Sequence, residues 1–254
     1  MTAAKNILLN FDPISLQQMD GVALMNRTDV KFVFSKELLP YFLEQLMERY
    51  YVLDVEGNRI SRYESLYFDT QKFDLYFSHH RKKSSRYKIR CRKYVESDLH
   101  FFEVKFKNNK GRTIKDRIKQ SYIDGKIDNI AEGLLKEKTP IVADMLEAKF
   151  WVNYSRITLV NKCAPERVTI DLNVTFKNED QEMIVEDMVI AEVKQDKEVA
   201  SKFLELMKKN RIRRSGISKY CHGVINLYNS LKHNNFKKKL HLIKKTLHVT
   251  AANT

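Results

Sequence analysis

The stretch RYKIRCRKY (86–94) alternates cationic and apolar side chains along most of its length. Its first four even-numbered positions are all basic: Arg86, Lys88, Arg90 and Arg92. The odd-numbered positions between them hold Tyr, Ile and Cys. Because successive side chains of a strand point to opposite faces, this segment predicts a β-strand with one cationic face and one apolar face.

The same pattern recurs in FFEVKFK (101–107), where Glu103, Lys105 and Lys107 alternate with Phe and Val residues. Turn residues in KNNKGRT (107–113) then join this segment to TIKDRIK (113–119), which favours a hairpin. A single strand of this kind is typical of a protein surface. Several of them together predict a sheet that gathers cations in one place, and such a place binds a polyanion.

The rest of the chain predicts an α+β fold. Further strands are expected at 26–34, 64–70, 151–160, 167–176 and 189–195. Helices are expected at 35–50, 127–138, 198–210 and 217–232, with another one starting at Thr139-Pro140. If the sheet curves strongly or closes, its charged faces line a channel and its apolar faces pack outward against the helices. The interspersed acids that would relieve repulsion between the cations are Asp29, Glu103, Asp171 and Glu192.

The composition agrees with an anionic partner. The 254 residues include 46 Lys and Arg against 32 Asp and Glu, a net charge of +14. This excess favours nucleic acid, phosphate compounds or an acidic membrane surface, with a purely solubilising role as the alternative. A hydrophobic content of 43% is sufficient for a real core.

The three cysteines indicate a reducing compartment, because their number is odd and no pair has metal-ligand spacing: Cys91, Cys163 and Cys221. The first residues lack the apolar core of a signal peptide, and no stretch approaches the ~20 apolar residues of a membrane span. We therefore expect a cytoplasmic protein. The basic segment 236–249 is interpreted as a frayed, solvated tail. An exposed arm, a partner-binding helix or a helix on the inner face of a membrane, with a membrane-protein partner, stays open.

A set of short segments, taken in order, carries a family resemblance: RTDVKF, SLYFDT, YKIRCRK, FFEVKFK, IKDRI, YSRI, RVTIDL, AEVK and SKYCHG. This order resembles the VTC-type polyphosphate polymerase domain of the triphosphate tunnel metalloenzyme (CYTH-like) superfamily, over roughly residues 20–228. The resemblance implies a closed antiparallel β-barrel, the triphosphate tunnel, with helices packed outside. Residues 1–235 would form this single domain, and 236–254 a basic C-terminal tail.

The resemblance also implies a site. The candidate catalytic residues are Lys31, Arg90, Arg92, Lys105, Lys115, Arg156 and Lys194. The candidate substrate-binding residues are Tyr154, Arg167, Ser218 and Lys219. Glu192 is the candidate ligand of a divalent metal, Mn²⁺ or Mg²⁺. Many tunnel triphosphatases begin with Glu-x-Glu-x-Lys, whereas this sequence reads Arg27-x-Asp29-x-Lys31. The missing acid weakens the hydrolase and two-metal interpretations.

The implied function is that of a polyphosphate polymerase, an ATP-polyphosphate phosphotransferase. It would transfer the γ-phosphoryl of ATP to a growing inorganic polyphosphate chain inside the tunnel, so its partners would be ATP and polyphosphate. Two alternatives stay open. One is a triphosphatase that hydrolyses tripolyphosphate or nucleoside triphosphates. The other is a non-catalytic binder of polyphosphate or nucleic acid, although the sequence lacks the stacked aromatics typical of single-strand binders.

Overall fold

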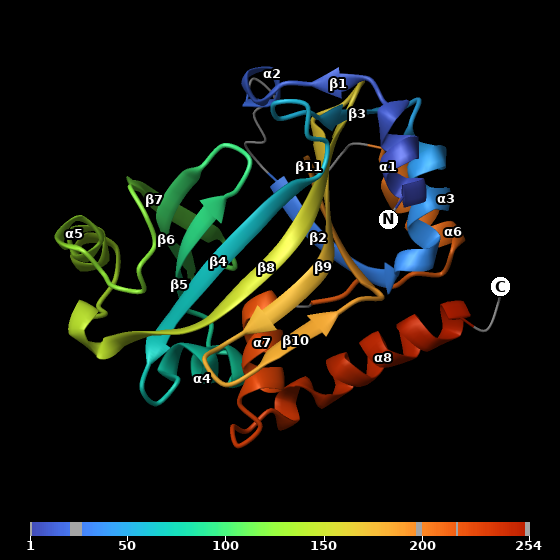
Figure 1. Cartoon of the computed structure of the whole chain (residues 1–254). Coiled ribbons are helices and arrows are strands. Elements are labelled where there is room, and N and C mark those ends of the chain that lie inside the picture. The colour runs from blue at the N-terminus through green and yellow to red at the C-terminus, as the bar shows by residue number, and fades with distance from the viewer. Residues whose placement is uncertain (1, 21–26, 197–199, 217, 252–254) are drawn as a thin grey trace.

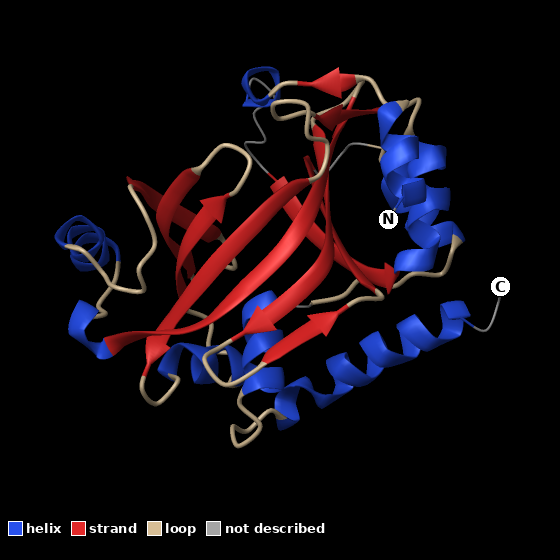
Figure 2. Ribbon diagram, viewed as in Figure 1, coloured by secondary structure: helices blue, strands red, loops and turns tan. Residues whose placement is uncertain are grey.

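The computed structural model describes residues 2–20, 27–196, 200–216 and 218–251. Its centre is a strongly curved sheet, shown in red in Figure 2, whose main path runs β2-β11-β9-β8-β4-β5-β6-β7 with every neighbouring pair antiparallel. In that order the strands are β2 (Arg27–Ser35), β11 (Met188–Asp196), β9 (Glu166–Lys177), β8 (Leu146–Asn161), β4 (Ser61–Thr70), β5 (Arg86–Tyr94), β6 (Leu99–Lys107) and β7 (Thr113–Gln120). Three short strands join this path at its margins: β1 (Pro13–Ile14), β3 (Tyr50–Leu53) and β10 (Glu182–Val185).

Helices surround the sheet (Figure 1). Together on one side lie α1 (Thr2–Leu9), α3 (Leu39–Leu46) and α6 (Lys202–Lys209), while α5 (Asn129–Lys138) lies apart from them beside β6 and β7. The remaining helices are α2 (Leu16–Asp20), α4 (Asp74–His80), α7 (Lys219–Leu227) and α8 (Lys237–Ala251). In the part of the chain that is described, no helix has the length and apolar character that crossing a membrane requires.

The predicted α+β class with external helices is confirmed, but the predicted closed barrel is not. The main path ends at β2 and at β7, and these two strands do not pair with each other in the described ranges. The free edge of β2 is instead occupied by the segment that precedes α7. The amide of Ser215 donates to the carbonyl of Lys31 at 2.7 Å, and Arg214 forms a bridge with Phe32. The sheet is therefore a curved wall with a seam.

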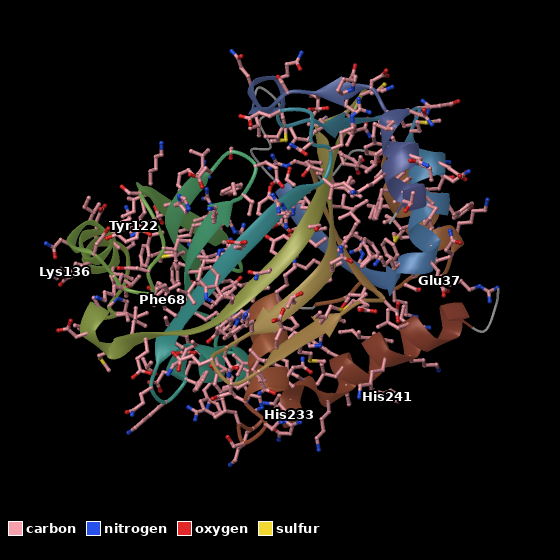
Figure 3. All side chains as sticks on the ribbon, in the orientation of Figure 1. Glu37, Phe68, Tyr122, Lys136, His233 and His241 are labelled. Atoms are coloured by element: carbon pink, nitrogen blue, oxygen red, sulfur yellow. The ribbon has the colours of Figure 1, made fainter. Side chains whose placement is uncertain are left out.

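The outer face of this wall is apolar, as the alternation predicts. One buried cluster packs the outer side chains of β2, β8, β9 and β11, among them Phe34 and Ile170, under α1, α3 and α6. A second cluster packs β4, β5 and β6 under α5 and includes Phe68, Ile89 and Phe102 (Figure 3 labels Phe68). Burial of these side chains contributes to the hydrophobic stabilisation of the wall.

Part of the inner face is also apolar, which the sequence did not predict. Val33, Val152 and Phe176 point inward and form a third buried cluster with Tyr220 and Ile243 of the surrounding helices. Helix α7 lies very close to the sheet here. A Cβ on Gly223 would come within 2.2 Å of the Phe150 ring, so only glycine fits. The packed helix leaves the remaining part of the inner face to form a cavity.

Several element boundaries differ from the expectations for local reasons. Thr139 ends α5 instead of starting a helix, because its hydroxyl donates to the carbonyl of Leu135 and accepts from the amide of Ile141. The segment after Pro140 is only a 3-10 turn before the long strand β8. The expected frayed tail is wrong over most of its length. It forms α8, which Ile243, at 6% exposure, anchors to the inner apolar cluster.

Candidate functional site

The curved sheet encloses a cavity of about 740 Å³. Its described lining contains eleven basic residues: Lys31, Lys88, Arg90, Arg92, Lys105, Lys115, Arg117, Arg156, Arg167, Lys194 and Lys219. Four acids also line it: Asp29, Glu96, Asp171 and Glu192. All twelve residues that the sequence singled out as candidate site residues are in this lining, including Tyr154 and Ser218. The structure thus brings them into one space, while their individual roles stay predictions.

The strand register places cations directly opposite one another. Lys88 on β5 pairs with Lys105 on β6, and Lys105 pairs with Lys115 on β7. Opposite like charges destabilise a sheet, and the cost grows where water is restricted. This row therefore stores repulsion that a bound anion would relieve, which is typical of an anion site rather than of a solubilising surface.

Glu103 is the acid that balances one part of the wall. Its side chain is 1% exposed and accepts from Arg90 at 2.6–2.7 Å, while the Lys115 ammonium lies 2.5 Å from its other oxygen. Burial opposes ionisation of Glu103, but Arg90, Arg92 and Lys115 together hold the pKa of its carboxyl well below the usual range. This carboxylate consequently stays ionised and fixes the direction of the Arg90 fork.

Asp171 balances the part of the wall formed by β8 and β9 in the same way. Arg156 donates to both oxygens of this carboxylate, at 2.6 and 2.9 Å, and Lys219 at the start of α7 donates to one of them. Burial opposes ionisation here too, but the two cations hold the pKa of Asp171 well below its usual range. The buried bidentate pair joins β8 to β9 and ties α7 to the cavity wall.

A layer of tyrosines supports the arginines. The Tyr63 and Tyr154 rings stack with centroids 5.2 Å apart. The Arg156 guanidinium lies 4.9 Å from the centre of the Tyr63 ring, and that of Arg92 lies 5.5 Å from it. Such stacking holds a guanidinium flat and leaves its edge free to donate. Tyr154 therefore positions cations, a role that the sequence could not separate from simple packing.

Glu192 is the acid to which the sequence assigned metal binding. In the structure it pairs with Lys31, and the Lys194 ammonium lies 3.7 Å from it. Asp29 lies on the neighbouring strand, where it pairs in register with Lys194. No three His, Cys, Asp or Glu side chains gather as a metal cage anywhere in the described ranges. Arg27 stands where many tunnel triphosphatases have the first acid of Glu-x-Glu-x-Lys. Its side chain lies outside the described residues.

This donor set suits a metal that arrives with its substrate. Mg²⁺ commonly binds through one or two carboxylates and completes its shell with water and substrate phosphates, and carboxylate oxygens also suit Mn²⁺. Glu192, with Asp29 beside it, fits that mode, whereas it does not fit a permanent all-protein cage. The residues are thus compatible with a divalent ion carried in by a phosphate chain.

Lys88 is a site residue that the sequence analysis did not assign. It lines the cavity and donates to the Ser218 hydroxyl at 2.9 Å. Ser218 in turn caps α7 by accepting from the amide of Cys221. The signal that could have found Lys88 was its parity with Arg90 and Arg92 in the opening stretch. The bond fixes the beginning of α7 against the cationic face of β5.

Lys105 lies in the middle of the cross-strand row of lysines, between Lys88 and Lys115. Its side chain is exposed and is part of the cavity lining. Burial, with the neighbouring cations acting in the same direction, lowers the pKa of Lys105 to about 7. Those cations are Lys88, Arg90 and Lys31, and Glu192 opposes them. Lys105 is therefore the group whose charge depends most directly on an anion in the cavity.

If the cavity binds a phosphate chain such as polyphosphate, we expect the binding to take up protons above pH 7. A bound phosphate raises the pKa of Lys105, so the empty cavity must gain a proton once the pH exceeds about 7. Affinity should be full below pH 7 and then fall by up to about tenfold per pH unit. Calorimetry at pH 8 in buffers of different ionisation enthalpy measures the uptake, and Lys105→Gln should take up about one proton fewer. Equal uptake by both proteins would contradict this assignment.

Solved structures with a similar fold are distant. A proposed adenylate cyclase from Vibrio parahaemolyticus has a TM-score of 0.44 at 11% identity, with 76% of this chain and 96% of that chain covered. One from Bacillus halodurans has a TM-score of 0.46 at 17% identity, with 76% and 96% covered. A proposed adenylyl cyclase from Hippeastrum, described as having a dominant triphosphatase activity, has a TM-score of 0.47 at 17% identity, with 77% and 93% covered. No curated protein matches the sequence.

The sequence itself matches the VTC domain over residues 26–228. The match runs from the last residue before β2 to just past the end of α7, so it includes every strand of the main path. It also includes all twelve candidate site residues, from Lys31 to Lys219. Because the match spans most of the chain and the whole cavity wall, this chain belongs to the VTC domain family.

Proposed function

We propose that this protein is a polyphosphate polymerase that transfers the γ-phosphoryl group of ATP to the end of an inorganic polyphosphate chain. The proposal rests on membership of the VTC domain family and on the charge of the cavity. The single observation that carries it is the excess of cations over carboxylates on the inner face. Glu103, Asp171 and Glu192 are each held by two cations, and basic side chains remain in excess.

The excess cations suit a chain of phosphates better than a single phosphate. In the described ranges, no ion pair joins Lys88, Lys105 or Arg92 to these acids, and the three cations come from the adjoining strands β5 and β6. Each internal phosphate of the polymer carries a negative charge and acceptor oxygens. Arginine forks bind such oxygens in pairs, and lysines supply compact charge. The wall can thus hold several successive phosphates in register.

The transfer needs positioning and charge neutralisation rather than a protein nucleophile. A terminal oxygen of the polyphosphate chain attacks the γ-phosphorus of ATP. The bond from that phosphorus to its bridging oxygen breaks, and ADP leaves with the electron pair. Arg90 and Arg92 would hold the reacting phosphate oxygens, while Lys105 and Lys115 would neutralise charge on the neighbouring phosphates. Tyr154 and Arg156 of β8 and Lys219 of α7 would position the chain beside them.

The remaining candidates have supporting roles in this proposal. Lys31 and Lys194 would balance Glu192 and the phosphates beside it, and Arg167 and Ser218 would bind phosphate farther along the chain. Glu192 would hold a divalent ion, Mg²⁺ or Mn²⁺. When bound, such an ion would supply positive charge that neutralises part of the charge of the phosphates.

A triphosphatase is the second candidate, because the same wall can bind a triphosphate whose acceptor is water. Two features favour the polymerase. The first strand has Arg27 where many triphosphatases have their first metal-binding acid. In addition, no cage of three metal ligands forms in the described part of the chain, whereas two-metal hydrolysis relies on a denser set of acids.

Product analysis tests the proposal. The protein is incubated with ATP labelled on its γ-phosphate, in the presence of Mn²⁺ or Mg²⁺, and the products are separated by gel electrophoresis. Polymerase activity predicts a ladder of labelled polyphosphate. One ADP should be released for each labelled phosphoryl group that is transferred to the chain. Orthophosphate as the sole labelled product would instead indicate a triphosphatase. Tight binding without turnover would indicate a non-catalytic binder.

A further inference from the structure

The cationic face of β5 and β6 continues beyond the cavity. Arg86 lies two residues before Lys88 on β5 and therefore shares its face, and Lys107 has the same relation to Lys105 on β6. Arg86 and Lys107 pair directly across the two strands, although neither is part of the cavity lining. The row of cations thus leads from the cavity to the ends of both strands. Such a like-charge pair at strand ends is costly unless an anion covers it.

Helix α8 brings a further cation to the same place. Lys239 is exposed, and its ammonium donates to the carbonyl of Gly216, just before α7, at 3.3 Å. Burial raises the pKa of the Cys221 thiol in the first turn of α7, while Lys88, Lys239 and Arg86 act to lower it. Lys88 of β5 donates to the Ser218 hydroxyl that caps α7, so cations of β5 and α8 meet at the beginning of α7. We call Arg86, Lys107 and Lys239 the cationic mouth.

His79 of α4 lies near the same group of cations. Burial, together with the nearby cations Lys88, Arg86 and Lys107, lowers the pKa of His79 to about 3. Its ring nitrogen lies 3.2 Å from the carbonyl of Tyr87, and its ring packs edge-on against Tyr220 of α7. A neutral His79 can therefore pack between α4 and α7 without adding to the repulsion. The cations of the mouth are the charges that remain facing solvent.

The surrounding sequence supplies almost no acid. Residues 75–95 contain no Asp or Glu, and neither do residues 206–254, which contain twelve Lys and Arg. In the described part of the chain, none of the three mouth residues has a carboxylate within ion-pair distance. Helix α8 is anchored through Ile243 and keeps exposed cations along its outer side, including Lys238 and Lys245; Figure 3 labels His241 on this helix. The region is thus complementary to a long anion.

We propose that the cationic mouth and the adjoining surface of α8 form a second binding site, outside the cavity, for the polyphosphate chain that extends from it. The inference rests on the proposed function, because it takes polyphosphate as the ligand of the cavity. A short phosphate chain fills the cavity and does not reach the mouth. A long chain contacts both, so the mouth contributes to the affinity for long chains alone and helps to retain the growing product.

Equilibrium binding with chelated metal tests this site independently of turnover. The variant Arg86→Gln/Lys107→Gln/Lys239→Gln is compared with the parent for tripolyphosphate and for a long polyphosphate. We expect its affinity for the long chain to fall by about tenfold or more, and its log affinity to depend on log salt with a slope smaller by about 2–3. Its affinity for tripolyphosphate should stay within about twofold, because the cavity lining is unchanged.

A matched control removes the same charge elsewhere. Lys5→Gln/Lys126→Gln/Lys209→Gln replaces three exposed lysines on α1, on the segment before α5 and on α6. This control should bind the long chain like the parent. Equal losses in both variants, or an unchanged affinity of the mouth variant for the long chain, would overturn the proposal. So would a mouth variant that loses only its binding to anionic phospholipid vesicles. In another outcome, the parent protein makes no polymer while the mouth variant still loses affinity for the long chain alone. That result would refute the proposed polymerase activity but support the second binding site.

Discussion

Arg92→Ala is expected to lower turnover by about a hundred- to a thousandfold while the protein still folds. Arg92 donates to the Ser65 hydroxyl at 3.1 Å and lies over the rings of Tyr63 and Tyr154. Truncation therefore removes a guanidinium from the phosphate path and leaves no buried carboxylate without its direct partner. Steady-state kinetics and a urea denaturation curve of the same preparation separate the two effects.

Arg90 is a less suitable residue for this test. Its removal would leave Glu103, which is 1% exposed, with Lys115 as its remaining close cation. Breaking a buried pair in this way costs about 3–5 kcal/mol, so lost activity of Arg90→Ala could reflect unfolding. The inner-wall cations are thus not equivalent, because some are part of the fold's own charge balance.

Two further variants make the Arg92 result specific. Arg92→Lys keeps the charge but loses the paired donors, and its activity should lie between those of the parent and Arg92→Ala. Arg49→Ala removes an exposed arginine outside the cavity lining and should leave activity unchanged. Near-normal turnover of a folded Arg92→Ala protein would show that the phosphates do not pass this part of the wall.

Salt should weaken polyphosphate binding very steeply. A polyanion that contacts 6–10 cations loses roughly a thousandfold or more in affinity between 50 and 200 mM salt. The cavity offers eleven basic side chains, and their excess over acids gives the whole lining a positive potential. Binding of a long polyphosphate is measured at several salt concentrations, with the metal chelated so that protein contacts alone are tested.

A double variant shows whether the cavity carries this dependence. Lys88→Gln/Lys105→Gln removes two members of the cross-strand row. The slope of log affinity against log salt should become smaller by about 1–2 in this variant. An affinity that does not depend on salt in the parent would contradict a cationic cavity as the binding site.

The sequence predicted those features of the fold that follow from alternation. The parity of Arg90 and Arg92 against Ile89 and Cys91 indicated which side chains face inward, and the structure confirms it. Alternation cannot show where a curved sheet stops. The seam between β2 and β7 depends on the contact of Ser215 with Lys31, which joins segments far apart in the chain.

At the site, too, the sequence could not show which residues of different strands meet. Whether Asp171 binds metal or pairs with a cation depends on Arg156, which reaches it from the neighbouring strand. Arg156 lies directly opposite Asp171 in the register of β8 and β9, so the carboxylate pairs across the two strands. The conformation of the basic tail likewise depends on a long-range contact. Ile243 packs into an apolar cluster whose other members come from distant strands, which the sequence could not show.

The central claim is that the cavity holds a phosphate chain along its cationic lining. A crystal structure of the protein with bound tripolyphosphate tests it most directly. The claim predicts density for three linked phosphates inside the cavity, within hydrogen-bond distance of Arg90 or Arg92 of β5 and of Arg156 of β8. Tripolyphosphate bound only on the outer surface, with the cavity lining unchanged, would contradict it.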